Sequence, residues 1–227
     1  MLREFRKGGG THLKLFMLTF AVGATLANAG TLFSDLGTGG SVYTTGPGAI
    51  VQGASGDNIA QARPFTVAGS GLFDVTQFDL GVVEDEGFLN TFTASIWTDT
   101  SNRPGTELGS WNLSAIGPNG SCCLLATQTG IAGVTLTGGT EYFMVLAPVN
   151  ENDGSKIEWE NNSLGQNSAF LGALNGGAWI NDSTGTEAAF DVLGDAAADP
   201  EPASILLLAT GLAGLLAMLR RKSRPSN

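Results

Sequence analysis

Histidine is almost missing from this chain of 227 residues: its one histidine, His12, lies near the N-terminus. Cysteine and basic residues are also scarce, with two Cys and 11 Lys and Arg against 21 Asp and Glu. Without a histidine in the body of the chain, a Ser-His-Asp or Cys-His hydrolase is excluded, as are most histidine-ligated zinc sites. Any chemistry there must rest on carboxylates.

A long apolar run of 18 or more residues is missing as well. The longest candidate, 205–219, has 15 uncharged residues and would span only about 22 Å as a helix, against a hydrocarbon core of ~30 Å. With Ala203, Ser204 and snorkelling arginines added, it reaches a length that a locally thinned bilayer accommodates. The basic residues Arg220, Arg221 and Lys222 follow it and would stay in the cytoplasm. We therefore predict a single C-terminal transmembrane helix, with the folded part outside. An ordinary membrane anchor is the alternative to the sorting signal described below.

The N-terminus has the pattern of a secretory signal. Four basic residues precede the apolar run 15–24, and Ala27-Asn28-Ala29 supplies small residues where a signal peptidase reads them. This pattern predicts a signal peptide over 1–29, cleaved before Gly30, rather than a transmembrane helix. Signal peptidase is thus an expected processing partner.

Residues 30–199 remain as one predicted domain. They hold 19 acidic and three basic side chains, so their formal charge is −16. Such a charge excludes nucleic acid as a partner and favours solubility outside the cell.

The domain lacks an apolar period of 3.6 and shows alternation instead. Phe92, Ala94 and Ile96 are predicted to share one face of a strand, and 142–146 reads as a central strand covered on both faces. Ile157 and Trp159 alternate with charged residues in the same way. Further strands are predicted over 75–82, 108–113, 134–136, 169–171, 178–180 and 188–193. Short strands between turn clusters predict an all-β fold, an antiparallel β-sandwich of jelly-roll type, with a barrel as the alternative.

The last 28 residues, 200–227, combine Pro200-Glu201-Pro202, the apolar run 205–219 and the basic tail 220–227. The two prolines favour an extended, accessible segment that suits a protease active site. This order of parts resembles the PEP-CTERM sorting signal of Gram-negative bacteria. The resemblance implies recognition by the membrane enzyme exosortase, transient anchoring in the inner membrane, and release or re-anchoring among surface polysaccharides, as in a biofilm matrix.

The domain itself is similar to the bacterial surface domains called choice-of-anchor. The similarity lies in 95–108, in Leu136-Thr137-Gly138-Gly139-Thr140-Glu141-Tyr142, and in the closing Ala189-Phe190-Asp191-Val192. It implies a surface β-sandwich and carries no catalytic residues. We therefore expect a non-enzymatic structural or adhesive protein.

Two other functions remain open. Trp97, Trp111, Trp159 and Trp179 include candidates for a sugar-stacking platform, which would make the domain a carbohydrate-binding module. A carboxylate-dependent glycosidase is the third candidate, because Glu158 and Glu160 lie about 6.6–6.8 Å apart along one strand, within the range that glycosidases use. Glu84 offers another such carboxylate.

We expect no cofactor, although calcium would suit the acidic cluster Glu84-Asp85-Glu86 or the loop 150–154. Neither has EF-hand spacing, and solvated turns are the favoured interpretation. Cys122 and Cys123 are adjacent, and a trans peptide holds neighbouring Cα atoms ~3.8 Å apart, below the usual disulfide range. Free or buried thiols are therefore expected first, an intermolecular bridge second and a vicinal ring third.

Overall fold

Within the part of the chain that the structure describes, fourteen antiparallel strands build the domain. The computed structural model describes residues 29–38, 42–46, 48–54, 56–197 and Leu212. The predicted signal peptide up to residue 28 and nearly all of the predicted C-terminal helix lie outside these residues. Within them, no helix has the length and hydropathy needed to cross a membrane. The strands are β1 (Gly30–Ser34), β2 (Ala49–Ala54), β3 (Asp57–Thr66), β4 (Leu72–Leu80), β5 (Val82–Glu84), β6 (Thr91–Asp99), β7 (Pro104–Ser114), β8 (Ala126–Thr129), β9 (Thr135–Thr137), β10 (Glu141–Ala147), β11 (Lys156–Trp159), β12 (Asn167–Leu174), β13 (Ile180–Thr186) and β14 (Phe190–Ala196).

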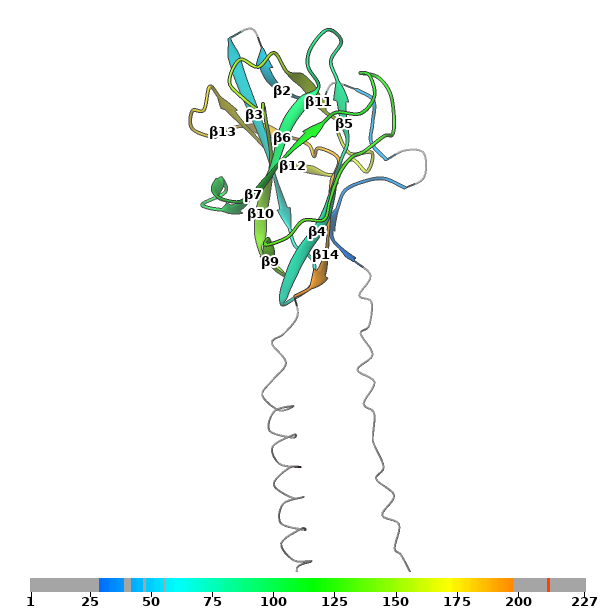
Figure 1. Ribbon diagram of the computed structural model, residues 1–227, viewed down its shortest axis with the longest axis vertical. Helices are drawn as coiled ribbons and strands as arrows, with labels where there is room; N and C mark the ends of the chain where they lie inside the picture. Colours follow the sequence, from blue (N-terminus) through cyan, green and yellow to red (C-terminus); the bar gives the residue numbers. More distant parts are fainter. Residues whose placement is uncertain (1–28, 39–41, 47, 55, 198–211, 213–227) are drawn as a thin grey trace, which may run out of the picture.

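The strands form two curled sheets, each shaped like half a barrel (Figure 1). The smaller sheet has the order β1-β14-β4-β8, with β9 also paired to β4. The larger has the order β5-β11-β2-β3-β10-β6-β7, with β12 on β3 and β13 on β12. The all-β prediction is confirmed.

One residue, Gly81, carries the chain from one sheet to the other. It separates β4 of the smaller sheet from β5 of the larger. A Cβ atom at this position would lie 2.8 Å from the Tyr43 ring and 3.0 Å from the Ala189 Cβ atom. Only glycine fits this close approach. Because Gly81 alone separates β4 from β5, an almost continuous strand joins the two sheets.

The main core fills the space between the two sheets. Phe92, Ala94 and Ile96 are fully buried in it, which confirms that they share one face. The central strand β10 is also buried on both faces, as predicted. Met144 and Leu146 point into the main core, whereas Phe143 and Val145 belong to a smaller cluster on the other face.

The sequence did not predict β3, because Arg63 and Pro64 interrupt its apolar pattern. Proline cannot donate to a ladder and is confined to unpaired edges. In the structure, β12 pairs with β3 only as far as Ala62, while β10 pairs with the other edge through Thr66. Pro64 therefore lies beyond the β12 ladder, where its missing N–H costs no sheet bond.

The strand predicted over 178–180 is wrong in its placement. β13 begins at Ile180 and runs through the polar residues up to Thr186. It pairs only with β12 at the end of the larger sheet. Because such an edge strand needs no apolar alternation, its sequence carried no strand pattern.

Candidate functional site

The first and last described strands of the domain lie side by side. Gly30, predicted to follow the signal cleavage, is the first residue of β1 and pairs with Gly194 of the last strand, β14. The final described backbone bond is made by Ala197, whose N–H donates to the Leu72 carbonyl at 2.9 Å. Both ends of the domain therefore lie at the same edge of the smaller sheet (Figure 1). Ala29 is the residue just before β1, while Ala27 and the sorting residues Pro200, Glu201, Pro202, Arg220, Arg221 and Lys222 lie outside the described residues.

This end, which we call the base, contains a shallow apolar hollow of about 430 Å³. Its lining includes Leu32, Phe73 and Ala196 together with several glycines. Leu72, at the start of β4, is 56% exposed beside it. The base therefore presents apolar surface at the point where the chain leaves toward Pro200.

Glu158 and Glu160 both accept hydrogen bonds from backbone N–H groups that precede β2. Glu158 accepts hydrogen bonds from the Gly48 N–H and from Asn119 Nδ2, both at 2.6 Å. Glu160 is fully buried, and its Oε2 accepts the Gly46 N–H at 3.4 Å. Burial, opposed by that hydrogen bond, raises the pKa of Glu160 to about 7, with repulsion from Glu158 adding to the rise. The pair holds the segment 44–48 against the sheet.

Replacing Glu158 by Ala is therefore expected to destabilise the domain by about 1–2 kcal/mol, because two hydrogen bonds to a charged group are lost at a partly exposed site. Urea unfolding of residues 30–199 measures the change. Glu107→Ala is the matched control, since Glu107 is exposed and accepts a bond only from the nearby Ser110 hydroxyl. An unfolding free energy within 0.3 kcal/mol of wild type, a margin of the order expected for neutral surface changes, would contradict the structural role.

The acidic cluster Glu84-Asp85-Glu86 lines an open hollow of about 450 Å³ with Asn119. Asp85 is committed to an ion pair with Lys156 at 2.5 Å. Among the described residues, no three His, Cys, Asp or Glu side chains gather in a way that could hold a metal ion.

The loop 150–154, the other calcium candidate, uses its oxygens internally. Asp153 accepts the Asn150 N–H at 3.0 Å and the Ser155 N–H at 2.8 Å. Burial acts to raise the pKa of Asp153, but bonds from Ser155, Asn150 and Val149 outweigh it and hold the pKa below its ordinary value. These contacts tie both carboxylate oxygens of Asp153 to backbone N–H groups of its own turn.

Arg63, Asp35 and Glu187 form a buried charged group that sequence reasoning missed. The Arg63 guanidinium lies 3.8 Å from the Phe170 ring centroid, and its Nη1 donates to the Ala62 carbonyl at 3.3 Å. Burial lowers the pKa of Arg63 to about 10, although attraction from Glu187 and Asp35 opposes the shift. One signal was available: Arg63 is one of only three basic residues in 30–199 and sits in the middle of an apolar stretch.

Both acids of this group hold protons unusually strongly. Burial raises the pKa of Asp35 to about 8, even though its Oδ1 accepts the Phe190 N–H at 2.7 Å. Burial also raises the pKa of Glu187 to about 7, and Arg63 limits that rise. All three side chains are buried: Asp35, Arg63 and Glu187 are 0%, 1% and 7% exposed.

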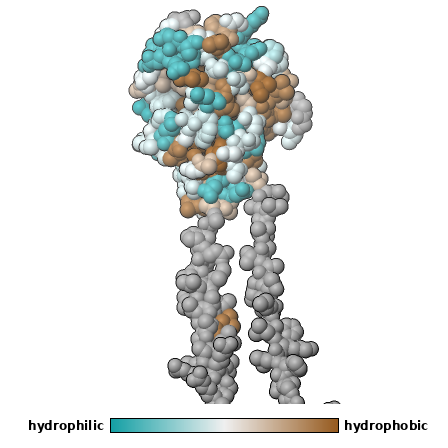
Figure 2. Space-filling view, in the orientation of Figure 1, coloured by the Kyte–Doolittle hydropathy of each residue, from teal (hydrophilic) through white to brown (hydrophobic). Residues whose placement is uncertain are grey.

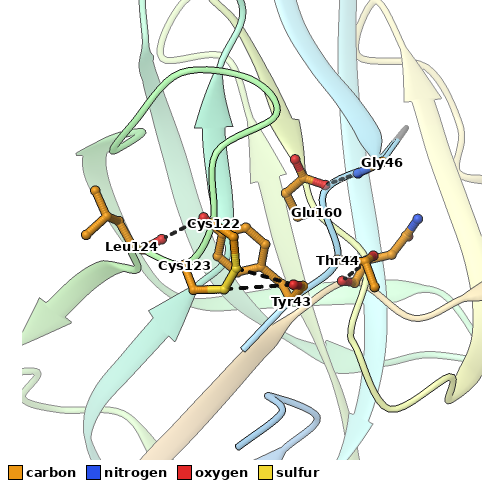
Figure 3. Close-up of a disulfide and its surroundings, with 8 residues drawn as sticks. Tyr43, Thr44, Gly46, Cys122, Cys123, Leu124 and Glu160 are labelled. Carbon is orange, nitrogen blue, oxygen red and sulfur yellow. Dashed lines mark hydrogen bonds between the residues drawn. A yellow bond between two sulfur atoms is a disulfide. The ribbon is translucent and has the colours of Figure 1, made fainter. Parts of the chain in front are cut away.

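Cys122 and Cys123 form a vicinal disulfide, so the expectation of free thiols is corrected (Figure 3). The expectation assumed a trans peptide, whereas the bond between the two residues is cis and their Cα atoms are 3.1 Å apart. The two sulfur atoms lie 3.5 and 3.9 Å from the Tyr43 carbonyl oxygen. The Tyr43 hydroxyl donates to the Leu124 carbonyl at 3.2 Å, which fixes the loop between β7 and β8 on the small cluster around Tyr43.

The four tryptophans divide between core and surface. Trp159 is fully buried and Trp111 packs edge-on against Phe78, at 5.3 Å between ring centroids. Trp97 and Trp179 are half-buried on the outer face of the larger sheet, over the cluster of Ala62, Phe143, Val145 and Leu171. Trp111 is partly buried like this second pair, but it packs against the main core, whereas Trp97 and Trp179 pack against the smaller cluster on the outer face.

Comparison with known proteins identifies a known motif in the C-terminal part of the chain. Residues 200–222 match the PEP-CTERM protein-sorting motif. The match includes Pro200, Glu201, Pro202 and the basic residues through Lys222, and it confirms the predicted sorting signal. No curated protein shows a significant match to the chain. The chain therefore carries a PEP-CTERM sorting motif, which makes it an exported, cell-surface-sorted protein and a substrate of exosortase.

Proposed function

We propose that residues 30–199 act outside the cell as a non-enzymatic structural or adhesive component of an exopolysaccharide matrix. The sorting motif over 200–222 carries this proposal, because it directs the protein to the cell surface. On this proposal, signal peptidase removes 1–29, and the segment 205–219 anchors the precursor transiently in the inner membrane. The two curled sheets are then a jelly-roll-like sandwich of the choice-of-anchor kind.

The way the domain uses its carboxylates supports a structural role. Glu158, Glu160 and Asp153 accept backbone N–H groups that hold loops in place. The formal charge of the domain, −16, favours a soluble, well-hydrated surface outside the cell.

The test compares the cohesion of the matrix in three strains: wild type, a strain without this chain, and that strain complemented with the full chain. We expect cohesion to fall without the chain and to return with it. Hydrolysis of the polysaccharide by purified 30–199, lost in Glu158→Gln, would instead identify an enzyme and overturn the proposal.

A carbohydrate-binding module is the second candidate, and the half-exposed pair Trp97 and Trp179 favours it. The Trp97 indole N–H donates to Ser95 Oγ at 2.7 Å, which fixes the ring on the outer face. Register with β7 places Ser110 beside Ser95 on the same face. Aromatic rings beside hydroxyl groups are the surface to which a sugar chain would bind.

If the domain is such a module, Trp97→Ala will weaken binding of the host's own exopolysaccharide about ten-fold or more, since a stacked ring is lost. Isothermal titration with residues 30–199 measures the affinity. Leu72→Ala is the control, because Leu72 is 56% exposed and lies on β4 in the smaller sheet, whereas Trp97 lies on the larger sheet. Saturable binding that depends on Trp97 would replace the structural proposal, and absence of saturable binding would support it.

A further inference from the structure

The distance between the folded domain and the sorting motif is very short. Ala197 is bonded to β4 through the Leu72 carbonyl, and Pro200 begins the matched motif. Three Cα–Cα steps of 3.80 Å separate these residues, so their Cα atoms lie at most about 11 Å apart. An enzyme that binds Pro200-Glu201-Pro202 must therefore approach within contact distance of the base.

The surface at this place has features of an interface. Leu72 is 56% exposed, and the neighbouring hollow of about 430 Å³ is lined by Phe73, Ala196 and glycines. Figure 2 shows apolar atoms beside hydrophilic ones at this lower end of the domain. A partner at this end would place an apolar side chain in the hollow and cover Leu72 on the other face of β4.

Two carboxylates at the base point to the charge of that partner. Asp74 and Asp195 lie directly opposite each other on β4 and β14, an arrangement that costs stability because like charges repel. Asp74 accepts a hydrogen bond from Thr135 Oγ1 at 2.7 Å, whereas the buried Oδ1 of Asp195 has no hydrogen-bond partner among the described residues. Asp195 also lines the hollow. A partner offering N–H or cationic donors would satisfy this pair.

We propose that the base, comprising Leu72, Phe73, Asp74, Asp195 and Ala196, is a second contact surface for exosortase, which thereby recognises the folded end of its substrate together with the motif. This inference rests on the exosortase assignment. An anionic membrane surface is the less favoured occupant, because Asp74 and Asp195 would be repelled by it.

The test follows conversion of the full-length precursor to its processed form in the exosortase-bearing host, by mass. Leu72→Lys and Asp195→Lys are each expected to slow conversion at least three-fold. Leu174→Lys is the matched control, since Leu174 is a similarly exposed leucine on β12 in the other sheet, and it should convert at the wild-type rate. Circular dichroism and thermal unfolding of each variant separate slow processing from misfolding, and Asp195→Asn provides a milder change that preserves shape.

A second arm inserts five Gly and Ser residues after Ala197. The contact proposal predicts slower conversion, because the motif and the base no longer engage the enzyme together. Faster conversion on insertion, with Leu72→Lys and Asp195→Lys at the wild-type rate, would show that the base is only an obstacle and would overturn the proposal. Glu201→Ala separates a failure of the sorting assignment from a failure of the contact surface. Conversion that persists in Glu201→Ala refutes the sorting assignment itself. Conversion that is lost in Glu201→Ala but proceeds at the wild-type rate in Leu72→Lys and Asp195→Lys refutes only the contact surface.

Discussion

Raising the pH from 5 to 9 is expected to lower the free energy of unfolding of residues 30–199 by at least about 4 kcal/mol, the order-of-magnitude share of Asp35 alone at about 1.4 kcal/mol per pKa unit. Four buried or partly buried acids contribute. The pKa is about 8 for Asp35 and about 7 for Glu160, Glu187 and Asp191, with burial the first cause in each case.

The sign follows from proton binding. Between pH 4, near the ordinary values of these groups, and pH 8, the folded domain keeps protons that the unfolded chain releases. The contribution of these groups is therefore fully present at the acidic end and is lost as the pH rises through their raised pKa values. Asp153 acts in the opposite direction, because its lowered pKa contributes stability that is lost as the pH falls through its titration.

Urea unfolding at pH 5, 7 and 9 measures this dependence. Asp35→Asn and Glu160→Gln should each flatten the profile, because neither replacement can ionise, and each is expected to be more stable than wild type at pH 9. Glu86→Gln is the control, since Glu86 is exposed on a turn. A wild-type profile that stays level between pH 5 and 9 would show that these acids are ionised in the folded domain.

The second large effect concerns the sorting motif. Glu201→Ala, or deletion of Arg220, Arg221 and Lys222, is expected to reduce the amount of protein at the cell surface at least ten-fold and to leave the domain folded. The reason is that these residues lie within the matched motif and outside the two sheets. Surface labelling of intact cells, compared with total protein, measures delivery.

Ser226→Ala serves as the control for the tail, because Ser226 lies beyond the matched residues 200–222. Limited proteolysis of each variant shows whether the domain keeps its fold. Delivery at the wild-type level in both tail variants would refute the sorting assignment.

The sorting signal could be predicted from the sequence because its parts are consecutive and need no folding to be recognised. The strands with clear alternation were predicted for a similar reason. Phe92, Ala94 and Ile96 reveal their shared face through spacing alone, and the apolar run 142–146 indicates a strand buried on both faces.

The buried charged group could not be predicted in this way. Asp35 follows β1 and Glu187 precedes β14, and only the pairing of these two strands brings them to the same region as Arg63. Their raised pKa values depend on burial, which sequence pattern does not report for an isolated acid. The vicinal disulfide was ranked third because the argument from Cα spacing assumed a trans peptide.

The pairing of the first strand with the last has a consequence for export. Residues emerge from the membrane in chain order, so Gly30 is among the first of the domain to appear and Gly194, its partner, among the last. The smaller sheet cannot close until almost the whole domain has crossed, and such distant contacts make folding slow. Completion of β14 comes only a few residues before Pro200. The domain thus reaches its finished shape at nearly the same moment as its sorting motif becomes available, which couples the timing of folding to the timing of delivery.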